Sequence, residues 1–287
     1  MRRHTHAGSW YDDDADSLQQ EIEEALSTDE EASLPSPKYI ISPHAGYTYS
    51  LKTAATVYRK IDVLKIVTIF ILGPSHYVSF RGCGIDTFSS LQTPVGVLQV
   101  DTDITKKLLN EDGFLEISRA AAEREHSIEM QLPILRHLMN RAGAGQVKVV
   151  PIIVGSMDAK RLEMAGKALL PYFQNKDTAF VISSDFCHFG RRFDFTVTGY
   201  ENEPIPLCEG IKKLDMDGVD HILKHDLDGF REYLMETGNT ICGCNAIQVL
   251  LMLIKLSEMS IRSEMIAYTQ GIQDSSVSYC SIAGVES

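Results

Sequence analysis

Four short polar segments of this chain carry a histidine or a cysteine, and three of them directly follow an apolar run. The side chains of interest in these segments are His44, His76, Asp185, His188 and Cys242. Imidazole, thiolate and carboxylate groups are the side chains that bind transition metals and transfer protons. Their types therefore indicate metal or acid–base chemistry.

The apolar runs predict that these side chains lie close together. Lys38–Ser42, Ile66–Leu72 and Ala179–Ile182 are short and rich in β-branched residues, which is typical of buried strands of a parallel sheet. The loops beyond the carboxyl ends of such strands line the ligand crevice. We therefore expect the candidate side chains to gather in one crevice, with the cysteine arriving from a segment that precedes a long apolar helix.

Each candidate also has a simpler structural interpretation. His44 would cap backbone groups of a turn, and His76 would face solvent in a loop. Asp185 and His188 are three residues apart, so a helical turn would place both on one face, where the acid orients the ring and raises its basicity. In the alternative, Asp185 caps a helix together with the two serines before it.

Cys242 and His126 stand at predicted helix starts. The helix dipole at such a position lowers a thiol pKa, although free cysteine is also often simply buried. Beside two histidines, Cys242 becomes a soft third metal ligand. His126 precedes a helix in which Ser127 is the expected N-cap and Glu129 is favoured by the helix dipole, so its ring could face an anion. The remaining cysteines outside the Cys-Gly-Cys segment are expected to pack in the core: Cys83, Cys187, Cys208 and Cys280.

Strand and helix patterns alternate over most of the chain. Periodicity predicts helices at 15–26, 51–60, 102–110, 128–141, 159–173, 230–236 and 246–258. Further strands are predicted at 147–154, 263–270 and 277–283. The alternation indicates an α/β fold with a central sheet and helices on both faces, in a single domain over residues 1–287.

The charge balance argues against nucleic-acid binding, because the net charge is −12, the pI is near 5.2 and no basic stripe occurs. No apolar region follows Met1–His4 as a secretory signal requires, and the longest apolar stretch, Ala246–Leu256, is too short to span a bilayer. The six irregularly spaced cysteines favour free thiols. We therefore expect a cytoplasmic protein without membrane insertion.

Phosphate-binding loops and the G-x-S-x-G elbow are absent from the sequence, which leaves nucleotide binding and that class of serine hydrolase unsupported.

Seven segments, in order along the chain, resemble the Memo family, the mediator of ErbB2-driven cell motility and its relatives. They are His6–Tyr11, Pro43–Tyr49, Gly73–His76, His126–Met130, Ser183–His188, Asn239–Gly243 and Gln273–Tyr279. The resemblance implies a fold similar to the LigB-type class III extradiol dioxygenases, which are non-haem iron enzymes. It places His44, His76 and Cys242 at the family's metal ligands, for an iron or copper ion.

The resemblance also implies that Asp185 and His188 form the neighbouring site pair and that His126 lines the same pocket; we assign these three residues catalytic roles. Animal members are associated with growth-factor-receptor signalling, phosphotyrosine-containing receptor tails, cell motility and redox-active metals. One departure concerns Cys244 and Asn245, since animal members usually have arginine and histidine there.

The leading hypothesis is a Memo-type protein that binds iron or copper through two histidines and a cysteine and acts in redox or metal handling, or in cell-motility signalling. One alternative is an active extradiol-type dioxygenase, with iron on His44, His76 and either Cys242 or Asp185. Another is an adaptor with a vestigial pocket that binds phosphopeptides near Arg191–Arg192. A fourth is a hydrolase in which His76 or His188 activates Cys242.

Overall fold

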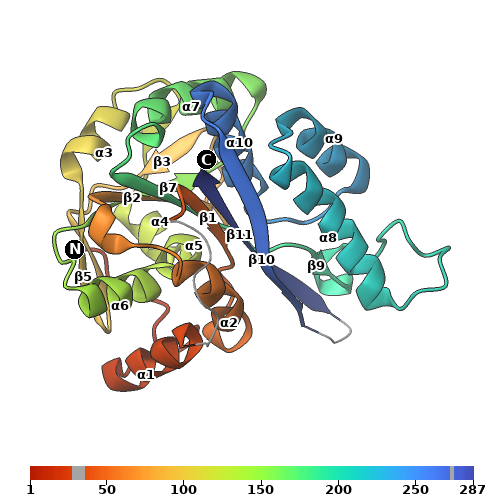
Figure 1. Cartoon of the computed structure of the whole chain (residues 1–287), viewed down its shortest axis with the longest axis horizontal. Helices are drawn as coiled ribbons and strands as arrows, with labels where there is room; N and C mark the ends of the chain where they lie inside the picture. The colour runs from red at the N-terminus through yellow and green to blue at the C-terminus, as the bar shows by residue number, and fades with distance from the viewer. Residues whose placement is uncertain (28–35, 272–274) are drawn as a thin grey trace.

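The computed structural model describes residues 1–27, 36–271 and 275–287, so Gln273 and Asp274 of the last family segment lie outside the described residues. Within the described residues, the centre of the protein is an eleven-stranded mixed sheet with helices on both faces (Figure 1). This architecture confirms the predicted α/β class with its central sheet and two helical layers.

Four neighbouring parallel strands form the middle of the sheet, in the spatial order β1 (Tyr39–Ser42), β8 (Thr178–Ser183), β2 (Thr68–Pro74) and β7 (Lys148–Val154). Each lies at a predicted apolar run. Alternate residues contact opposite hydrophobic clusters: Tyr39 and Ile41 belong to one, and Ile40 to the other. Both faces are therefore buried, which explains why these strands are apolar throughout rather than alternating.

The parallel arrangement predicted for the strands before the candidate residues holds in the middle of the sheet, but the sheet as a whole is mixed. A long hairpin, β10 (Ile261–Gln270) and β11 (Ser276–Glu286), adds antiparallel to β1 at one side. At the other side β3 (Cys83–Ile85) pairs antiparallel with β7 and parallel with β6 (Phe114–Glu116). The remaining strands are short: β4 (Ser90–Thr93), β5 (Gly96–Val100), and β9 (His188–Phe189), which pairs with β11.

The helices divide between the two faces of the sheet (Figure 1). One face is covered by α3 (Thr102–Leu108), α7 (Ala159–Phe173), α8 (Leu207–Leu223), α9 (Leu227–Thr237) and α10 (Cys244–Ser257). The other is covered by α1 (Ala15–Leu26), α2 (Tyr47–Tyr58), α4 (Arg119–Arg124), α5 (His126–Glu129) and α6 (Leu132–Ala142). Two 3₁₀ turns, η1 (Val63–Lys65) and η2 (Arg191–Phe193), complete the elements.

Two helical predictions differ from the structure. The predicted helix 128–141 is divided into α5 and α6, and Pro133 lies in the first turn of α6, where its missing amide hydrogen costs no helical hydrogen bond. The 17-residue α8 was not predicted, because glycines and charged residues interrupt its apolar positions. The predicted bounds of α1 and α7 are confirmed. None of the described helices is long and apolar enough to cross a membrane.

Candidate metal centre

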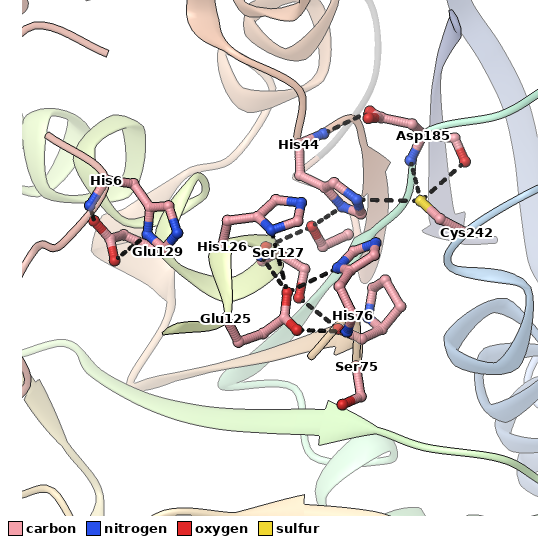
Figure 2. A network of polar contacts seen from close by, with 12 residues as sticks. His6, His44, Ser75, His76, Glu125, His126, Ser127, Glu129, Asp185 and Cys242 are labelled. Carbon is pink, nitrogen blue, oxygen red and sulfur yellow. Dashed lines mark hydrogen bonds and ion pairs between the residues drawn. The ribbon is translucent and has the colours of Figure 1, made fainter. Parts of the chain in front are cut away.

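The carboxyl ends of the central strands bring the predicted side chains together. His44 lies two residues after β1, His76 two residues after β2 and Asp185 two residues after β8. Cys242 lies two residues before α10 and reaches the same place, with its Sγ 3.1 Å from His44 Nε2 (Figure 2). His44, His76 and Cys242 each offer one ligand atom within 4.8 Å of the others. The three side chains thus form one cluster of donor atoms.

A hydrogen-bond chain determines which nitrogen of His44 carries the proton. Ser183 Oγ donates to the carbonyl oxygen of Ser127 at 2.7 Å and accepts from Gln131 Nε2 at 2.9 Å. Its only hydrogen is therefore used, so it must accept from His44 Nδ1, which lies 2.8 Å away. His44 consequently presents an unprotonated Nε2 to the cluster. Burial and the neighbouring His76 hold the pKa of His44 well below its usual value, which favours this neutral form.

Glu125 orients His76 in the same way. Its Oε1 lies 2.8 Å from His76 Nδ1, and its Oε2 accepts from the backbone N–H of His76 at 2.6 Å. Although burial opposes ionisation, the hydrogen bonds from His76 lower the pKa of Glu125 to about 2. The carboxylate accepts the Nδ1 hydrogen, so Nε2 of His76 is also free to bind. A carboxylate or hydroxyl behind each ring is the usual support of metal-binding histidines.

Asp185, His188 and Cys242 form a second cluster of donor atoms within 4.8 Å of one another. The predicted helical turn at Asp185–His188 is wrong, because the chain runs without helix from 184 to 187 into β9. Asp185 Oδ1 accepts from the backbone N–H of His44 at 2.8 Å, so it caps the β1–α2 turn rather than a helix of its own. His188 Nδ1 lies 2.9 Å from the carbonyl oxygen of Phe186, to which it can only donate.

The helix dipole was predicted to lower the pKa of the Cys242 thiol, but the structure indicates the opposite shift. Burial raises it well above its usual value, and the neighbouring Asp185 adds to this effect. The thiol is held in place by close docking: a Cβ at Gly243 would lie 2.4 Å from Ser184 Cβ, so only glycine permits this approach. A bound cation would reverse the balance, since metal coordination deprotonates a thiol.

His126 begins α5 and faces the same pocket, but the predicted N-cap at Ser127 is wrong. Glu125 is the N-cap, because its side chain accepts from the backbone N–H of Ser127. The His126 ring stacks between His76 and Trp10, with ring centroids 4.3 Å away on each side. Its Nδ1 is buried without a hydrogen-bond partner, and burial lowers its pKa to about 2. This nitrogen lies 3.6 Å from Glu125 Oε1, so the neutral His126 ring sits beside the carboxylate that orients His76.

These side chains open into a cavity of about 590 Å³. Its lining includes Arg192, which the sequence placed near the crevice, and further residues that it did not indicate as cavity residues: Trp10, Tyr49, Phe193 and Tyr279. The guanidinium of Arg192 lies 4.3 Å from the Phe193 ring centroid. A larger cavity of about 840 Å³ lies between α1, α2 and β10, but its lining contains no histidine or cysteine. Among the described residues, the groups of histidine, cysteine and carboxylate donor atoms all lie at or beside the histidine cavity.

Comparison with known proteins assigns the fold to a family. The chain matches the family of Memo-like proteins over residues 2–283. The chain belongs to the Memo family. It is 37% identical over 306 residues to the MEMO1 family protein of Schizosaccharomyces pombe, covering 97% of both chains. It is 35% identical over 286 residues to Protein MEMO1 of Homo sapiens, covering 97% of this chain and 95% of the human one.

A solved structure shares the fold. The crystal structure of an uncharacterized protein from Escherichia coli K12 superposes with a TM-score of 0.52 at 14% identity, covering 86% of this chain and 98% of that chain. The named family relatives are similar over nearly the whole chain, so the match includes all elements that carry the donor cluster.

The departure from the family pattern at Cys244 and Asn245 lies outside the lining of the cavity. Cys244 is partly buried at the start of α10, and Asn245 Nδ2 donates to the carbonyl oxygen of Gly155 at 3.1 Å. The second thiol of the Cys-Gly-Cys segment therefore packs beside the cluster instead of joining it.

Proposed function

We propose that this protein binds a redox-active transition metal ion, iron or copper, through His44 Nε2, His76 Nε2 and Cys242 Sγ, and acts in redox or metal handling. The observation that carries the proposal is the hydrogen bonding behind the rings. Both Nδ1 atoms are committed as donors, so both Nε2 atoms are left as ligands at the place where the thiol arrives.

The chemistry of the donor set supports a soft or borderline ion. Two imidazoles and a thiolate favour copper, zinc or thiolate-bound iron over the hard cations that prefer oxygen ligands. A bound ion of this kind supplies electron transfer or Lewis acidity. The protein supplies two imidazoles oriented by hydrogen bonds, a sulfur atom and a cavity beside them, in which His126 and His188 can hold or move a proton of a ligand.

Elemental analysis after anaerobic purification tests the proposal. We expect near-stoichiometric iron or copper in the wild type and none in the His44→Ala/Cys242→Ser variant. A matched control, His221→Ala/Cys244→Ser, changes the same residue types outside the cluster and should retain the metal. Equal metal in both variants, or none in the wild type after reconstitution with either ion, would refute the proposal.

A second candidate function is an oxygenase that uses the same centre. Asp185 and His188 favour it, since both lie beside Cys242 and offer a carboxylate ligand and an acid–base group. Oxygen uptake with catechol-type substrates, after anaerobic loading with Fe(II), measures this activity. Turnover that is lost in His44→Ala would support it, and uptake that is unchanged in this variant would contradict it.

A third candidate is an adaptor for phosphotyrosine-containing receptor tails in cell-motility signalling, a role proposed from the family resemblance. The position of Arg192 at the cavity favours it, because phosphate recognition needs a basic group. The neighbouring Arg191 does not line the cavity. Phosphopeptide affinity should therefore fall in Arg192→Ala and persist in Arg191→Ala; unchanged affinity in Arg192→Ala would remove the basis of this role.

The cysteine-hydrolase hypothesis requires one revision. His44 is hydrogen-bonded to the thiol, with its Nε2 3.1 Å from Cys242 Sγ, whereas the expected His76 and His188 each offer a nitrogen within 4.8 Å of it. Because burial raises the pKa of this thiol, the metal-free site does not favour a reactive thiolate. We therefore place this hypothesis behind the others.

A further inference from the structure

One buried carboxylate, that of Glu129, binds the N-terminal segment (residues 2–11) at three residues. Its Oε1 accepts from the backbone N–H of His6 at 2.9 Å and from the Tyr11 hydroxyl at 2.8 Å. Its Oε2 accepts from His6 Nδ1 at 2.9 Å, as Figure 2 shows, and from Arg2 Nη1 at 2.8 Å. The Glu129 side chain has no exposed surface, so these donors replace water completely.

The bonds to Glu129 hold both ends of a tight turn. Within this turn, Gly8 N–H donates to the carbonyl oxygen of Tyr11 at 2.8 Å, and Trp10 N–H donates to that of His6 at 2.9 Å. Gly8 has a φ of +77°, a conformation that glycine adopts without strain. Because His6 and Tyr11 are both bonded to Glu129, the carboxylate fixes the position of Trp10, which lies between them in the sequence.

Trp10 connects this turn to the cavity. Trp10 lines the cavity, and its ring centroid lies 4.3 Å from that of His126, at an interplanar angle of 32°. His126 and Glu129 are the first and last residues of α5. The same short helix therefore carries one ring of the contact and the carboxylate that places the other.

Arg2 extends the connection to His76. Besides Glu129, its guanidinium donates to the carbonyl oxygens of Ala122 and Glu125, the latter at 2.8 Å. Glu125 is the residue whose carboxylate orients His76. A segment at the start of the chain thus contacts the support of a candidate metal ligand, although it holds no ligand itself.

We propose that Glu129 is a positioning residue of the cavity, which closes the N-terminal segment onto α5 and so sets the contact between Trp10 and His126. The inference deepens the proposed function and rests on it, since the cavity shaped in this way is the one that adjoins the metal centre. Glu129 itself lines no part of the cavity and belongs to none of the three groups of donor atoms at the cavity, the third being His76, Glu125 and His126.

Tryptophan fluorescence measures directly how firmly the Trp10 ring is held, because Trp10 is the only tryptophan in the chain. Glu129→Gln replaces one acceptor oxygen by an amide group that points hydrogen atoms at two donors. We expect acrylamide to quench Trp10 severalfold more strongly in this variant, with emission shifted to longer wavelength, while circular dichroism shows a folded protein. The control is Glu23→Gln, since Glu23 also pairs with a histidine and an arginine, His137 and Arg141, but between α1 and α6.

A gentler variant covers the case in which Glu129→Gln does not fold. Tyr11→Phe removes one of the bonds to Glu129 and keeps the ring that lies 5.4 Å from that of Tyr47, so a smaller increase in quenching is expected. Quenching equal to wild type in Tyr11→Phe, and in Glu129→Gln if it folds, would overturn the inference.

Cobalt binding separates the two proposals. We expect Glu129→Gln to bind Co²⁺ like the wild type, and His44→Ala to lose Co²⁺ while its Trp10 is quenched like the wild type. Suppose instead that both variants lose Co²⁺ binding and that Trp10 is quenched to the same extent in the two. Glu129 would then only support the fold in general and would not position the cavity. Failure of the wild type to bind Co²⁺ would refute the metal centre and leave the quenching result to decide the role of Glu129.

Discussion

His44 Nε2 lies 3.1 Å from Cys242 Sγ, although the two residues are 198 positions apart in the sequence. Neither is reached by a long loop: His44 lies two residues after β1, and Cys242 lies two residues before α10. The pair is therefore positioned by rigid elements, which is the arrangement that a metal centre requires.

This pair predicts that metal binding at the proposed centre depends on pH. Because burial raises the pKa of Cys242, the thiol carries a proton at neutral pH, and metal binding must release it. Metal affinity should thus fall as pH falls, by about tenfold for each pH unit. Competition with a chelator of known affinity at a series of pH values measures this slope. The slope should be lost in Cys242→Ser, and a wild-type affinity that does not change with pH would contradict the prediction.

Removing the support of His44 should weaken metal binding without removing a ligand. Ser183→Ala deletes the oxygen that accepts from His44 Nδ1 and from Gln131 Nε2. We expect metal affinity to fall by about 10- to 100-fold, which is typical when such a support is removed. The control is Ser281→Ala, a fully buried serine bonded to Thr56. Both variants should lose thermal stability, but only Ser183→Ala should lose affinity.

The close approach of Gly243 to β8 predicts a selective loss of the thiol ligand. In Gly243→Ala the new Cβ would lie 2.4 Å from Ser184 Cβ and 2.7 Å from the carbonyl oxygen of Ser183, so the Cys242 segment must move away. When this variant is loaded with Co²⁺, the charge-transfer absorption between the Cys242 sulfur and cobalt should therefore be absent. Gly145→Ala is the matched control, because a Cβ there meets no atom within 4 Å. A normal charge-transfer band in Gly243→Ala would show that the segment tolerates the shift.

The buried carboxylate of Glu129 should make stability fall in acid. Burial opposes its ionisation, but hydrogen bonds from His6 and the charge of Arg2 lower its pKa from 4.5 to about 2. The folded protein thus binds fewer protons than the unfolded chain between these values. The ionised group stabilises the fold above pH 4.5, by about 3 kcal/mol, and this contribution is lost as pH falls toward 2.

Urea unfolding at several pH values tests this window. The stability difference between wild type and Glu129→Gln should be largest near neutral pH and should shrink below pH 4.5. Glu264→Gln, an exposed substitution on β10, should follow the wild type throughout. A difference between wild type and Glu129→Gln that is independent of pH would mean that the charge of the carboxylate contributes little.

Much of the fold could be predicted from the sequence, because hydrophobic periodicity is a local property. The four parallel strands and helices such as α1 and α7 were predicted from runs of apolar residues alone. Elements without such a signal were missed, among them α8 and the short strand β9. The antiparallel addition of β10 and β11 was also missed, since pairing partners depend on contacts between distant segments.

The grouping of His44, His76, Asp185 and His188 was predicted by one rule, namely that residues after parallel strands meet at one edge of the sheet. Local sequence could not assign the partners of these residues. Ser183 was interpreted as a helix cap and Glu129 as a first-turn acid, whereas the structure shows that the serine supports His44 and the glutamate holds the N-terminal segment. The sequence by itself determined the elements and the residue types at the site. Only the tertiary structure decided the hydrogen-bond partner of each ring, the pKa of the thiol and the position of Trp10, because these depend on burial and on groups that lie far away along the chain.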